Sequence, residues 1–586
     1  MYRDTITNSN KHMKSLFFFL LLFPLSLLVS QNPKYEVRAA WISTASGDWP
    51  KTLYMEEQQR SLVDMFDLLQ RNNFNTVYFQ VRPRGNTFYK SDIEPWAQQL
   101  TGTLGEDPGW DPLAFAIDEA HKRGMELHAW FNVAKVWGAS DLPANPRHIT
   151  KKHPDWIQHS DGEWWIDMGI PEARAYTEDL VMELVKNYDI DGIQFDFIRY
   201  PSGPFNDTKS YAKWGNGQDL QSWRRGNITA FVRDCYTEIQ QLKPWCKVGS
   251  SPLGIYNSID GAASEFAGYT AVAQESRAWL RQGITDYLVP QIYWSLGEQD
   301  NPYDPDFEIL CKDWAGENYG REVIAGLGIY KDNIQPEVQQ QVIVSRDSRL
   351  QGEAFFRFDN ISGILDQLGS VYRTMALFPP MIWKDSIPPL APEHITVQSK
   401  ENASTAIQWN DPKPASDGQL PYWYVVYSSS SQPVDTRKAE NIAAVVPATV
   451  HSIEDDQSAA GGKQVYYTVT SLDRSGNESV LPSEPAGETP SIFTRYMRPA
   501  SAPTLSANYP EPFSGRTYIT YDLPVKSTVT ITLTYLPTQK DTVIVNEVKD
   551  PGLHIVAIDG SMYPAGEIEC RLQADGTVLR RVMQKK

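Results

Sequence analysis

Along residues 35–380, short apolar runs alternate with segments whose apolar residues recur at helical spacing. Eight runs have the length and composition of β-strands, and a helix-length segment follows most of them. The predicted strands are 37–43, 76–81, 126–132, 192–197, 248–251, 287–294, 323–329 and 352–358. Intervening helices are predicted at, for example, 58–71 and 112–123, the second ended by Gly124. The alternation predicts an α/β fold, a (β/α)8 TIM-type barrel over residues 35–382.

The pattern changes after a proline-rich segment at residues 379–392, which predicts a domain boundary. Short alternating strands follow, predicted at 405–409, 422–428 and 464–471, and a second proline-containing linker spans 490–503. We therefore expect two all-β sandwich domains, at 388–490 and 500–586. A spacer or surface-attachment role is the default for both domains, with carbohydrate binding through exposed aromatic residues as the alternative.

The amino terminus has the pattern of a secretory signal peptide over residues 1–30. Lys11 and Lys14 precede an apolar run at 16–29, which is too short for a comfortable membrane span, and a polar segment follows. No later segment is apolar enough to span a membrane. We therefore expect an exported protein whose mature chain has no membrane span and whose location is periplasmic, cell-surface or extracellular.

The composition and net charge of the chain restrict the kinds of partner that we expect it to bind. The chain has 586 residues, of which 41% are apolar, so it can bury several cores, and its net charge of -18 argues against nucleic acid as a partner. The four cysteines are too scattered for a metal site or a disulfide framework, although Cys235 and Cys246 could either pair or stay reduced. Nucleophile-elbow and phosphate-binding motifs are absent. We expect no metal and no cofactor.

Residues 190–201 form the most informative run. Gln194 and Asp196 share one face of the predicted strand, while the alternate positions are apolar. Asp196 therefore comes last on the inward face, at the carboxyl end where barrels place their chemistry. Asp191 enters at the opposite end, where residues usually serve stability. The alternative for Asp196 is a buried aspartate paired with Arg199.

Other predicted strands also end in polar or aromatic residues of one parity, and these residues would converge at the same rim. They are Gln80, Arg82, His128, Trp130, Asn132, Gln291, Tyr293 and Trp294, with Asp48 and Trp49 in the loop after the first strand. Such a rim suits a sugar, because hydroxyl groups need polar partners and C–H faces stack on aromatic rings. Alternatively, the histidine and the tryptophans are packed core groups, while Arg38 and Arg82 neutralise buried carboxylates.

Several spaced runs along residues 36–294 carry a resemblance to a known family. They are EVRAAW at 36–41 with DWP at 48–50, FQVRP at 79–83 with FYKS at 88–91 and PW at 95–96, TG at 101–102 with DPL at 111–113, AHKRGMELHAW at 120–130, DGIQFD at 191–196 with RYP at 199–201, and PQIYW at 290–294. Together these runs resemble the glycosyl hydrolase-like family 10 barrel. The resemblance implies an exported bacterial glycosidase-like protein that acts on peptidoglycan glycan strands. Trp41, Tyr89, Arg199 and Tyr200 join the rim residues as candidate substrate-binding groups.

The chain departs from that family pattern at three places, namely Asn86, the run 132–135 and Phe197, where the family commonly has other polar residues. The β domains carry weaker resemblances. Residues 422–427 and 465–479 resemble a fibronectin type III domain. Residues 508–513 and 552–556 resemble the immunoglobulin-like modules at the ends of exported bacterial proteins.

Glycoside hydrolysis usually needs two carboxyl groups. We expect Asp196 to be the nucleophile or the charge-stabilising carboxylate, held ionised by Arg199 or Arg82. For the acid, the flanking tryptophans favour Asp167 by raising its pKa, with Glu94 and Asp359 as alternatives. Glu353 and Asp286 begin their strands and are disfavoured.

The predicted function is a secreted glycoside hydrolase acting on a polysaccharide or glycan-strand substrate, specifically a bacterial cell-wall or related amino-sugar glycan. Two alternatives stay open. One is a non-catalytic glycan-binding or surface-scaffold protein on a glycosidase fold, which the departures at Asn86 and Phe197 favour. The other is a hydrolase of another polysaccharide.

Overall fold

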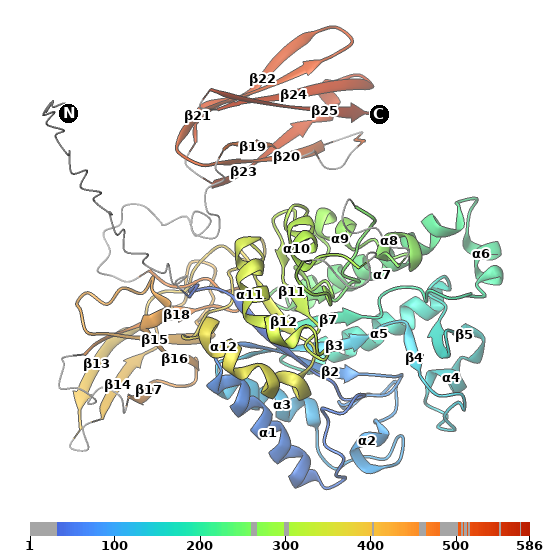
Figure 1. Cartoon of the computed structure of the whole chain (residues 1–586), viewed down its shortest axis with the longest axis vertical. Helices are drawn as coiled ribbons and strands as arrows, with labels where there is room; N and C mark the ends of the chain where they lie inside the picture. Colours follow the sequence, from blue (N-terminus) through green and yellow to red (C-terminus); the bar gives the residue numbers. More distant parts are fainter. Residues whose placement is uncertain are drawn as a thin grey trace, which may run out of the picture.

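The computed structural model describes residues 32–259, 266–297, 304–400, 404–455, 465–480, 502–505, 508, 512–513, 516–549, 552–574 and 576–586. The predicted signal peptide and most of the predicted linker at 490–503 lie outside these ranges. Along the chain, a parallel barrel is followed by one group of antiparallel sheets beside it and then by a second, C-terminal group (Figure 1).

The parallel barrel is nearly closed and contains nine strands in the order β10-β9-β8-β7-β3-β2-β1-β12-β11. They are β1 Val37–Ile42, β2 Thr76–Arg82, β3 Glu126–Asn132, β7 Gly192–Asp196, β8 Lys247–Ser250, β9 Tyr287–Leu288, β10 Glu322–Val323, β11 Ala325–Leu327 and β12 Gly352–Phe355. The barrel confirms the predicted fold, but the strand count differs from eight. The predicted strand at 323–329 is divided at Ile324, so that β10 pairs with β9 while β11 pairs with β12.

Side chains alternate between two environments along these strands, as the period of two predicts. Val77 and Ile193 belong to the large hydrophobic core that includes residues of the surrounding helices. Trp41, Tyr78 and Trp130 belong to a second cluster contributed mainly by the inward positions of the strands. The barrel interior is therefore packed with aromatic side chains, as in other barrels of this kind.

Helices cover the outside of the barrel (Figure 1). They are α1 Met55–Arg71, α2 Gln98–Thr101, α3 Pro112–Lys122, α4 Ile149–Lys152, α5 Pro171–Asn187, α6 Thr208–Trp214, α7 Leu220–Leu242, α8 Gly268–Ala271, α9 Ser276–Gln282, α10 Phe307–Ala315, α11 Val338–Asp347 and α12 Leu365–Val371. Gly124, which follows α3, has a φ of +69°, a conformation that glycine adopts easily and that explains why the helix ends there.

An insertion after β3 forms a small antiparallel sheet at the carboxyl end of the barrel. Its strands are β4 Lys135–Trp137, β5 Ile157–Ser160 and β6 Glu163–Ile166, in the order β4-β6-β5. Lys135 pairs with Trp165 across β4 and β6, while the backbone N–H of Ile166 donates to the Ala134 carbonyl 2.7 Å away. The insertion is thereby anchored next to the end of β3.

The amino end of the barrel is filled with paired charges. Arg38 donates to Glu36 at 2.8 Å, and Arg346 donates to the same carboxylate at 2.6 Å. Below β9, the side chains of Trp383 and Lys384 donate to Asp286 at 2.8 Å and 3.0 Å. The segment that leaves the barrel therefore folds back to cover this end.

Two antiparallel three-stranded sheets follow the barrel and pack against it. Their strands are β13 Glu393–Ser399, β14 Thr405–Asn410, β15 Trp423–Ser429, β16 Ile442–Pro447, β17 Ser452–Asp455 and β18 Tyr466–Leu472. Arg474 forms two hydrogen bonds with Asp189, at 2.7 Å and 2.9 Å, and the ring of Tyr422 contacts that of His121. The first β region is thus joined to the barrel's amino end.

A second pair of sheets lies at the carboxyl terminus, above the barrel in Figure 1. Its strands are β19 Thr504–Leu505, β20 Arg516–Leu523, β21 Ser527–Tyr535, β22 Lys540–Lys549, β23 Gly552–Asp559, β24 Gly566–Ala574 and β25 Thr577–Lys585. These strands pair with one another in antiparallel fashion, and Phe513 adds an isolated parallel bridge to Lys585 of β25. The antiparallel sheets support all-β regions in part, while the predicted domain limits and the fibronectin and immunoglobulin resemblances stay predictions.

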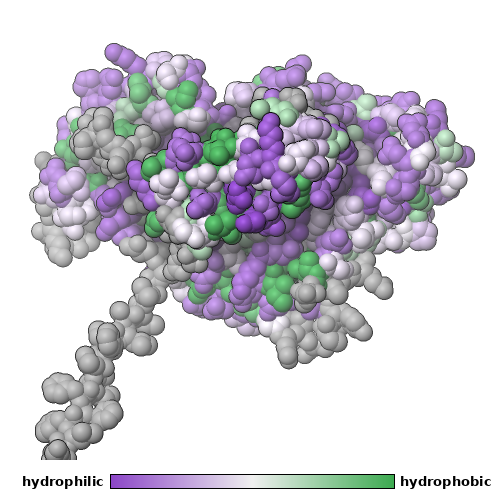
Figure 2. Space-filling view, turned by 90° about the horizontal axis from the view of Figure 1, so that it is seen from above, coloured by the Kyte–Doolittle hydropathy of each residue, from purple (hydrophilic) through white to green (hydrophobic). Residues whose placement is uncertain are grey.

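Hydrophilic residues dominate the face that Figure 2 shows, and hydrophobic ones occur there in small separate patches. Within the described ranges, no helix is both long enough and hydrophobic enough to cross a membrane. All four cysteines are buried and unpaired, so Cys235 and Cys246 are two separate thiols in this structure.

Candidate active site

Asp196 lies at the carboxyl end of β7, with 9% of its surface exposed. Its Oδ1 accepts a hydrogen bond of 2.7 Å from the backbone N–H of Phe197, and its Oδ2 accepts one of 3.2 Å from the Trp130 indole. Burial raises the pKa of the Asp196 carboxyl group, and the attraction of Arg199 offsets this only in part. Arg199 therefore favours the ionised form of Asp196, as expected, but burial has the larger effect on its pKa.

Several aromatic side chains lie near the carboxyl group of Asp196. The ring of Phe356 lies 6.2 Å from that of Trp130 and stacks with that of Tyr293 at 5.7 Å. Tyr330, 45% exposed, lies 5.9 Å from Tyr293. Burial, with repulsion from Asp196, raises the pKa of Tyr293 well above its ordinary value, which places both groups in one neighbourhood.

Positively charged side chains lie on another side of Asp196. The Arg199 guanidinium lies 5.2 Å from the centre of the Phe197 ring, and the Lys135 ammonium lies 4.6 Å from the same ring. Burial, with repulsion from Arg84, lowers the pKa of Lys135 to about 8, while attraction from Asp196 acts in the opposite direction. The predicted substrate-binding residue Arg199 is thus half-buried near Asp196.

The structure places Asp167 apart from the immediate partners of Asp196. Its Oδ2 accepts a hydrogen bond of 2.6 Å from Ser210, and its Oδ1 accepts one of 2.9 Å from the Gly169 backbone. Burial raises its pKa, which agrees with the expected direction. Among the described residues, however, Asp167 and Asp196 share no hydrogen-bond partner.

The two other candidate acids have distinct environments. Glu94 is completely buried and accepts two hydrogen bonds from Arg82, at 2.7 Å and 2.6 Å. Arg82 also donates to the Asn132 carbonyl at 2.5 Å, so this arginine binds the protein itself. Asp359 is 60% exposed at its side chain and lies 3.5 Å from Arg357.

Asp48, at the same rim after β1, is a further carboxyl group with a shifted pKa. Its Oδ1 accepts hydrogen bonds from Arg357 at 2.6 Å and from the Asp359 backbone at 2.9 Å, and its Oδ2 accepts one from the Ser43 backbone at 2.7 Å. Burial nevertheless raises its pKa to about 6. Its sequence position indicated the rim, but no sequence signal indicated this burial.

Several predicted rim residues lie inside the barrel. Trp41 is 1% exposed and donates from its indole to Gln194 at 2.6 Å. His128 bridges Tyr287 at 2.6 Å and Glu126 at 3.1 Å. These interactions match the structural alternatives, in which such side chains build and fill the barrel.

Other predicted site residues lie at the carboxyl-end rim of the barrel, where two of them form hydrogen bonds with the backbone of neighbouring segments. The side-chain oxygen of Gln80 accepts hydrogen bonds from the backbone N–H groups of residues 44 and 45, both 3.0 Å away. Asn132 donates to the Pro83 carbonyl at 2.8 Å, and Tyr89 and Tyr200 are buried. Apart from the residues already described near Asp196, the predicted site residues that are half-buried are Gln291 and Trp294.

Sequence reasoning did not select four residues that contact or neighbour the groups around Asp196. They are Arg84, Lys135, Tyr330 and Phe356. Each follows or ends a predicted strand, which is the signal that could have found them. Their residue types can be read from the sequence, but which of them lie together is visible only in the folded chain.

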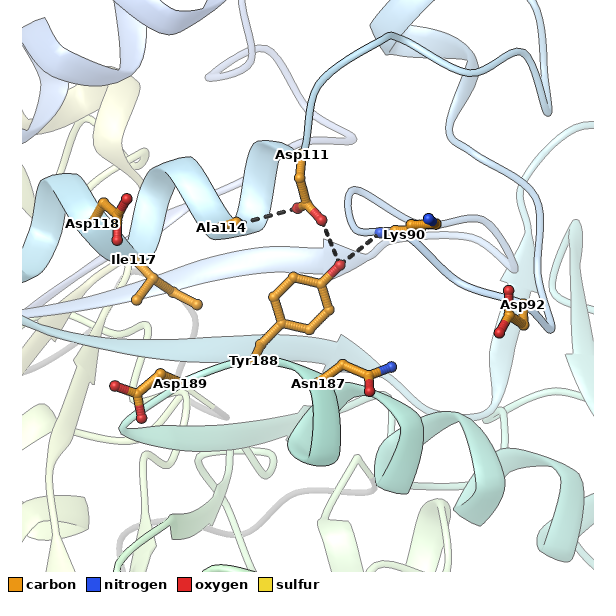
Figure 3. A pocket seen from close by; sticks show the side chains of 9 residues that line it. All are labelled: Lys90, Asp92, Asp111, Ala114, Ile117, Asp118, Asn187, Tyr188 and Asp189. Carbon is orange, nitrogen blue, oxygen red and sulfur yellow. Dashed lines mark hydrogen bonds between the residues drawn. The ribbon is translucent and has the colours of Figure 1, made fainter.

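A well-defined pocket lies elsewhere on the barrel. It measures about 530 Å³ and lies beside α3 and the end of α5, as Figure 3 shows. It is lined by Lys90, Asp92, Asp111, Ala114, Ile117, Asp118, Asn187, Tyr188 and Asp189. Tyr188 donates to Asp111 at 2.6 Å across its floor. None of the predicted site residues lines this pocket, so we place the candidate active site around Asp196.

Comparisons with known proteins agree with a glycosidase-like barrel. The model of the family "Glycosyl hydrolase-like 10" matches residues 36–344. The "Glycosyl hydrolase YngK" of Bacillus subtilis (strain 168) is 33% identical over 479 residues, which cover 76% of this chain and 92% of the relative. The "Glycosyl hydrolase DigH" of Escherichia coli (strain K12) is 36% identical over 315 residues, 49% of this chain and 71% of that protein.

A solved structure with a detectable likeness is the alpha-L-fucosidase isoenzyme 2 from Paenibacillus thiaminolyticus. It is 15% identical, covers 58% of this chain and 49% of its own, and has a TM-score of 0.42. A likeness this low supports no functional conclusion. The assignment therefore depends on the family match and on the two sequence relatives.

Proposed function

We propose, from the premise that this chain belongs to the glycosyl hydrolase-like 10 family, that it is a secreted glycoside hydrolase of a bacterial cell-wall or related amino-sugar glycan. The supporting observation is the position of Asp196. This carboxyl group ends a parallel barrel strand, accepts a hydrogen bond from Trp130 and lies near aromatic and cationic side chains. The carboxyl ends of barrel strands are where such folds carry their active sites.

In this proposal, Asp196 is the central carboxyl group. We assign Asp196 the role of nucleophile or charge-stabilising carboxylate, whose ionised form Arg199 attracts although burial raises its pKa, and we assign the acid role to its partner. The hydrogen bonds from Phe197 and Trp130 fix its orientation. Tyr293 and Tyr330 offer ring faces on which a sugar can stack.

A second carboxyl group is required. We retain Asp167 as the proposed partner, because its pKa is raised by burial, and add Asp48 as the alternative, because it lies at the same rim. The amide variants Asp167→Asn and Asp48→Asn separate these two proposals. The true partner is the one whose loss reduces turnover about as strongly as the loss of Asp196.

The proposed location is outside the cytoplasm. The apolar run at residues 16–29 and the basic residues before it support export by a signal peptide. The β regions that follow the barrel are proposed to be spacers or attachment modules. Detection of the mature chain in the periplasm, at the cell surface or in the medium checks this part of the proposal.

The experiment measures reducing ends released from purified peptidoglycan glycan strands freed of stem peptides. Wild type is expected to release them, and Asp196→Asn is expected to lower the rate at least about 1,000-fold, because a group that touches the scissile bond is removed. Equal release by the two proteins refutes the role of Asp196. Strand binding by wild type without any release indicates the non-catalytic glycan-binding alternative instead.

A further inference from the structure

Three cationic side chains lie near one another at the carboxyl end of the barrel: Lys135 interacts with Asp196, Arg199 and Arg84. Arg199 follows β7, Lys135 begins β4, and Arg84 lies in the loop after β2. Arg199 and Lys135 approach the ring of Phe197 to 5.2 Å and 4.6 Å. The Arg84 guanidinium lies against Gly138, where an added Cβ atom would be 2.0 Å from Nη1. The absence of a side chain at Gly138 thus leaves room for Arg84 in this position.

Among the described residues, few carboxylates lie within contact distance of these three cationic side chains. Lys135 forms an ion pair with Glu163, whose side chain is 27% exposed. Within the described part of the chain, neither Arg84 nor Arg199 forms an ion pair with a carboxylate, and the only hydrogen bond from the Arg199 side chain is a long one, 3.4 Å, to the Tyr200 carbonyl. Asp161, the other nearby carboxylate, accepts hydrogen bonds from Ser202 and Gly203.

Half-buried guanidinium groups without a carboxylate partner are costly to maintain, because they lose hydration without a full replacement. Burial lowers the pKa of both Arg84 and Arg199, which agrees with this incomplete compensation. Elsewhere in the barrel, buried arginines such as Arg82 and Arg346 have carboxylate partners at 2.6–2.8 Å. Arg84 and Arg199 therefore differ from these two arginines, because neither forms an ion pair with a carboxylate among the described residues.

We propose that Arg84, Lys135 and Arg199 form a subsite for a carboxylate carried by the sugar next to the scissile bond. This inference rests on the proposed function and names its substrate class, an acidic glycan. A guanidinium group binds a carboxylate through two parallel N–H donors, and the neighbouring ammonium adds charge. A neutral sugar of the same shape makes none of these charge-assisted hydrogen bonds, so the subsite discriminates between the two.

The experiment compares binding of two matched probes to the full chain carrying Asp196→Asn, which prevents turnover from consuming them. The probes are peptide-free peptidoglycan glycan strands with their lactyl carboxylates intact, and the same strands after chemical reduction of the carboxylates to alcohols. The measured quantity is the ratio of the two dissociation constants. We expect the intact strands to bind at least about 10-fold more tightly, since each charge-assisted hydrogen bond is stronger than a neutral one.

Substitutions at the two members of the Lys135–Glu163 ion pair are expected to move the ratio of dissociation constants in opposite directions. Lys135→Met should lower it to about 2 or less, whereas Lys135→Arg should keep it. Glu163→Gln should raise it about 3-fold, because it removes the carboxylate that competes for Lys135. A mere folding defect cannot produce both shifts. Lys312→Met is the matched control, because its side chain is 65% exposed on α10, and it should leave the ratio unchanged.

The inference is overturned if the parent ratio is near 1, or if Lys135→Met and Lys312→Met change it equally. Its failure is distinguishable from that of the proposed function. Reducing-end release by wild type, with no preference for carboxylates, refutes the subsite and keeps the hydrolase. Carboxylate-dependent binding with no release by wild type refutes the hydrolase and keeps the subsite.

Discussion

Two aspartates lie at opposite ends of β7 and have opposite electrostatic environments. Burial alone would raise the pKa of Asp191, but His121, whose Nε2 lies 2.8 Å from its Oδ2, and the Leu127 N–H lower it. Among the residues that the structure describes, Asp196 has no cationic partner in contact, and burial raises its pKa. Asp191 thus has a charged partner at the amino end, which the first β region covers, whereas the described residues give Asp196 none in contact at the carboxyl end.

The difference teaches that a shifted pKa alone does not identify a site. Glu322, at the covered amino end, has its pKa raised by burial to about 8, with its Oε1 unpaired among the described atoms. It is completely enclosed by its own domain, near Lys247 and Glu126. What separates Asp196 is its position at the rim, next to half-buried side chains that could contact a substrate.

The sharpest test of this comparison makes the same chemical change at both ends. Asp191→Asn should destabilise the chain by about 3 kcal/mol, because it leaves the largely buried His121 without its partner. Asp196→Asn should leave stability unchanged or higher, because the charged carboxyl group is itself unfavourable there. Thermal unfolding of both variants checks this. Equal destabilisation by the two would remove the contrast.

The pH dependence of the Asp191 effect gives an additional check. The pKa of Asp191 is lowered, so its contribution is present above its ordinary value of 3.8 and is lost as pH falls through the folded value. The pKa of His121 is raised, so its contribution is present below 6.5 and is lost as pH rises through the folded value. The difference between wild type and Asp191→Asn should therefore be largest between about pH 4 and 6.5.

The second prediction concerns Glu322, whose burial adds an unfavourable charge at the covered end. A carboxyl group with a raised pKa gives stability that is complete below 4.5 and is lost as pH rises through about 8. Glu322→Gln should remove this loss, which amounts to about 2 kcal/mol between pH 6 and pH 8. Denaturant unfolding at the two pH values measures it, with Glu567→Gln on β24 as an exposed control. Parallel pH profiles for wild type and Glu322→Gln would contradict the prediction.

The smallest expected effect is at the contact between the barrel and the first β region. Arg474→Ala removes the ion pair with Asp189, whose side chain is 52% exposed, and a cation–π contact of 3.6 Å with Tyr422. We expect a loss of about 1 kcal/mol, since partly exposed ion pairs contribute little. Arg580→Ala, on β25 and 59% exposed, is the control. A loss as large as that of Asp191→Asn would show that this contact governs stability.

The strands were predictable because their pattern is local. Seven of the eight predicted strands overlap one observed barrel strand, and the helix at 112–123 begins at the predicted residue. Periodicity reports which face of a strand is buried, whatever the distant neighbours are. The break at Ile324 was not predictable, because it depends on how β10 and β11 pair with different neighbours.

The site was predictable only in part. Asp196 and Arg199 were placed at the rim from parity and position alone, and the structure brings them together. The environments of Arg82 and Asp167 depend on partners that the strand pattern does not identify. Arg82 pairs with Glu94, 12 residues away, and Asp167 accepts a hydrogen bond from Ser210, 43 residues away.

The sequence by itself determined the alternation of strands and helices, the parity of the rim residues and the family to which the barrel belongs, because these are properties of residue order. Only the tertiary structure decided which charges are matched. The pair of Asp191 with His121, for example, forms between residues that only folding brings within a few ångströms. Electrostatic interactions and burial act through space, so their signs at Asp191 and Asp196 could differ although the two residues lie on one strand.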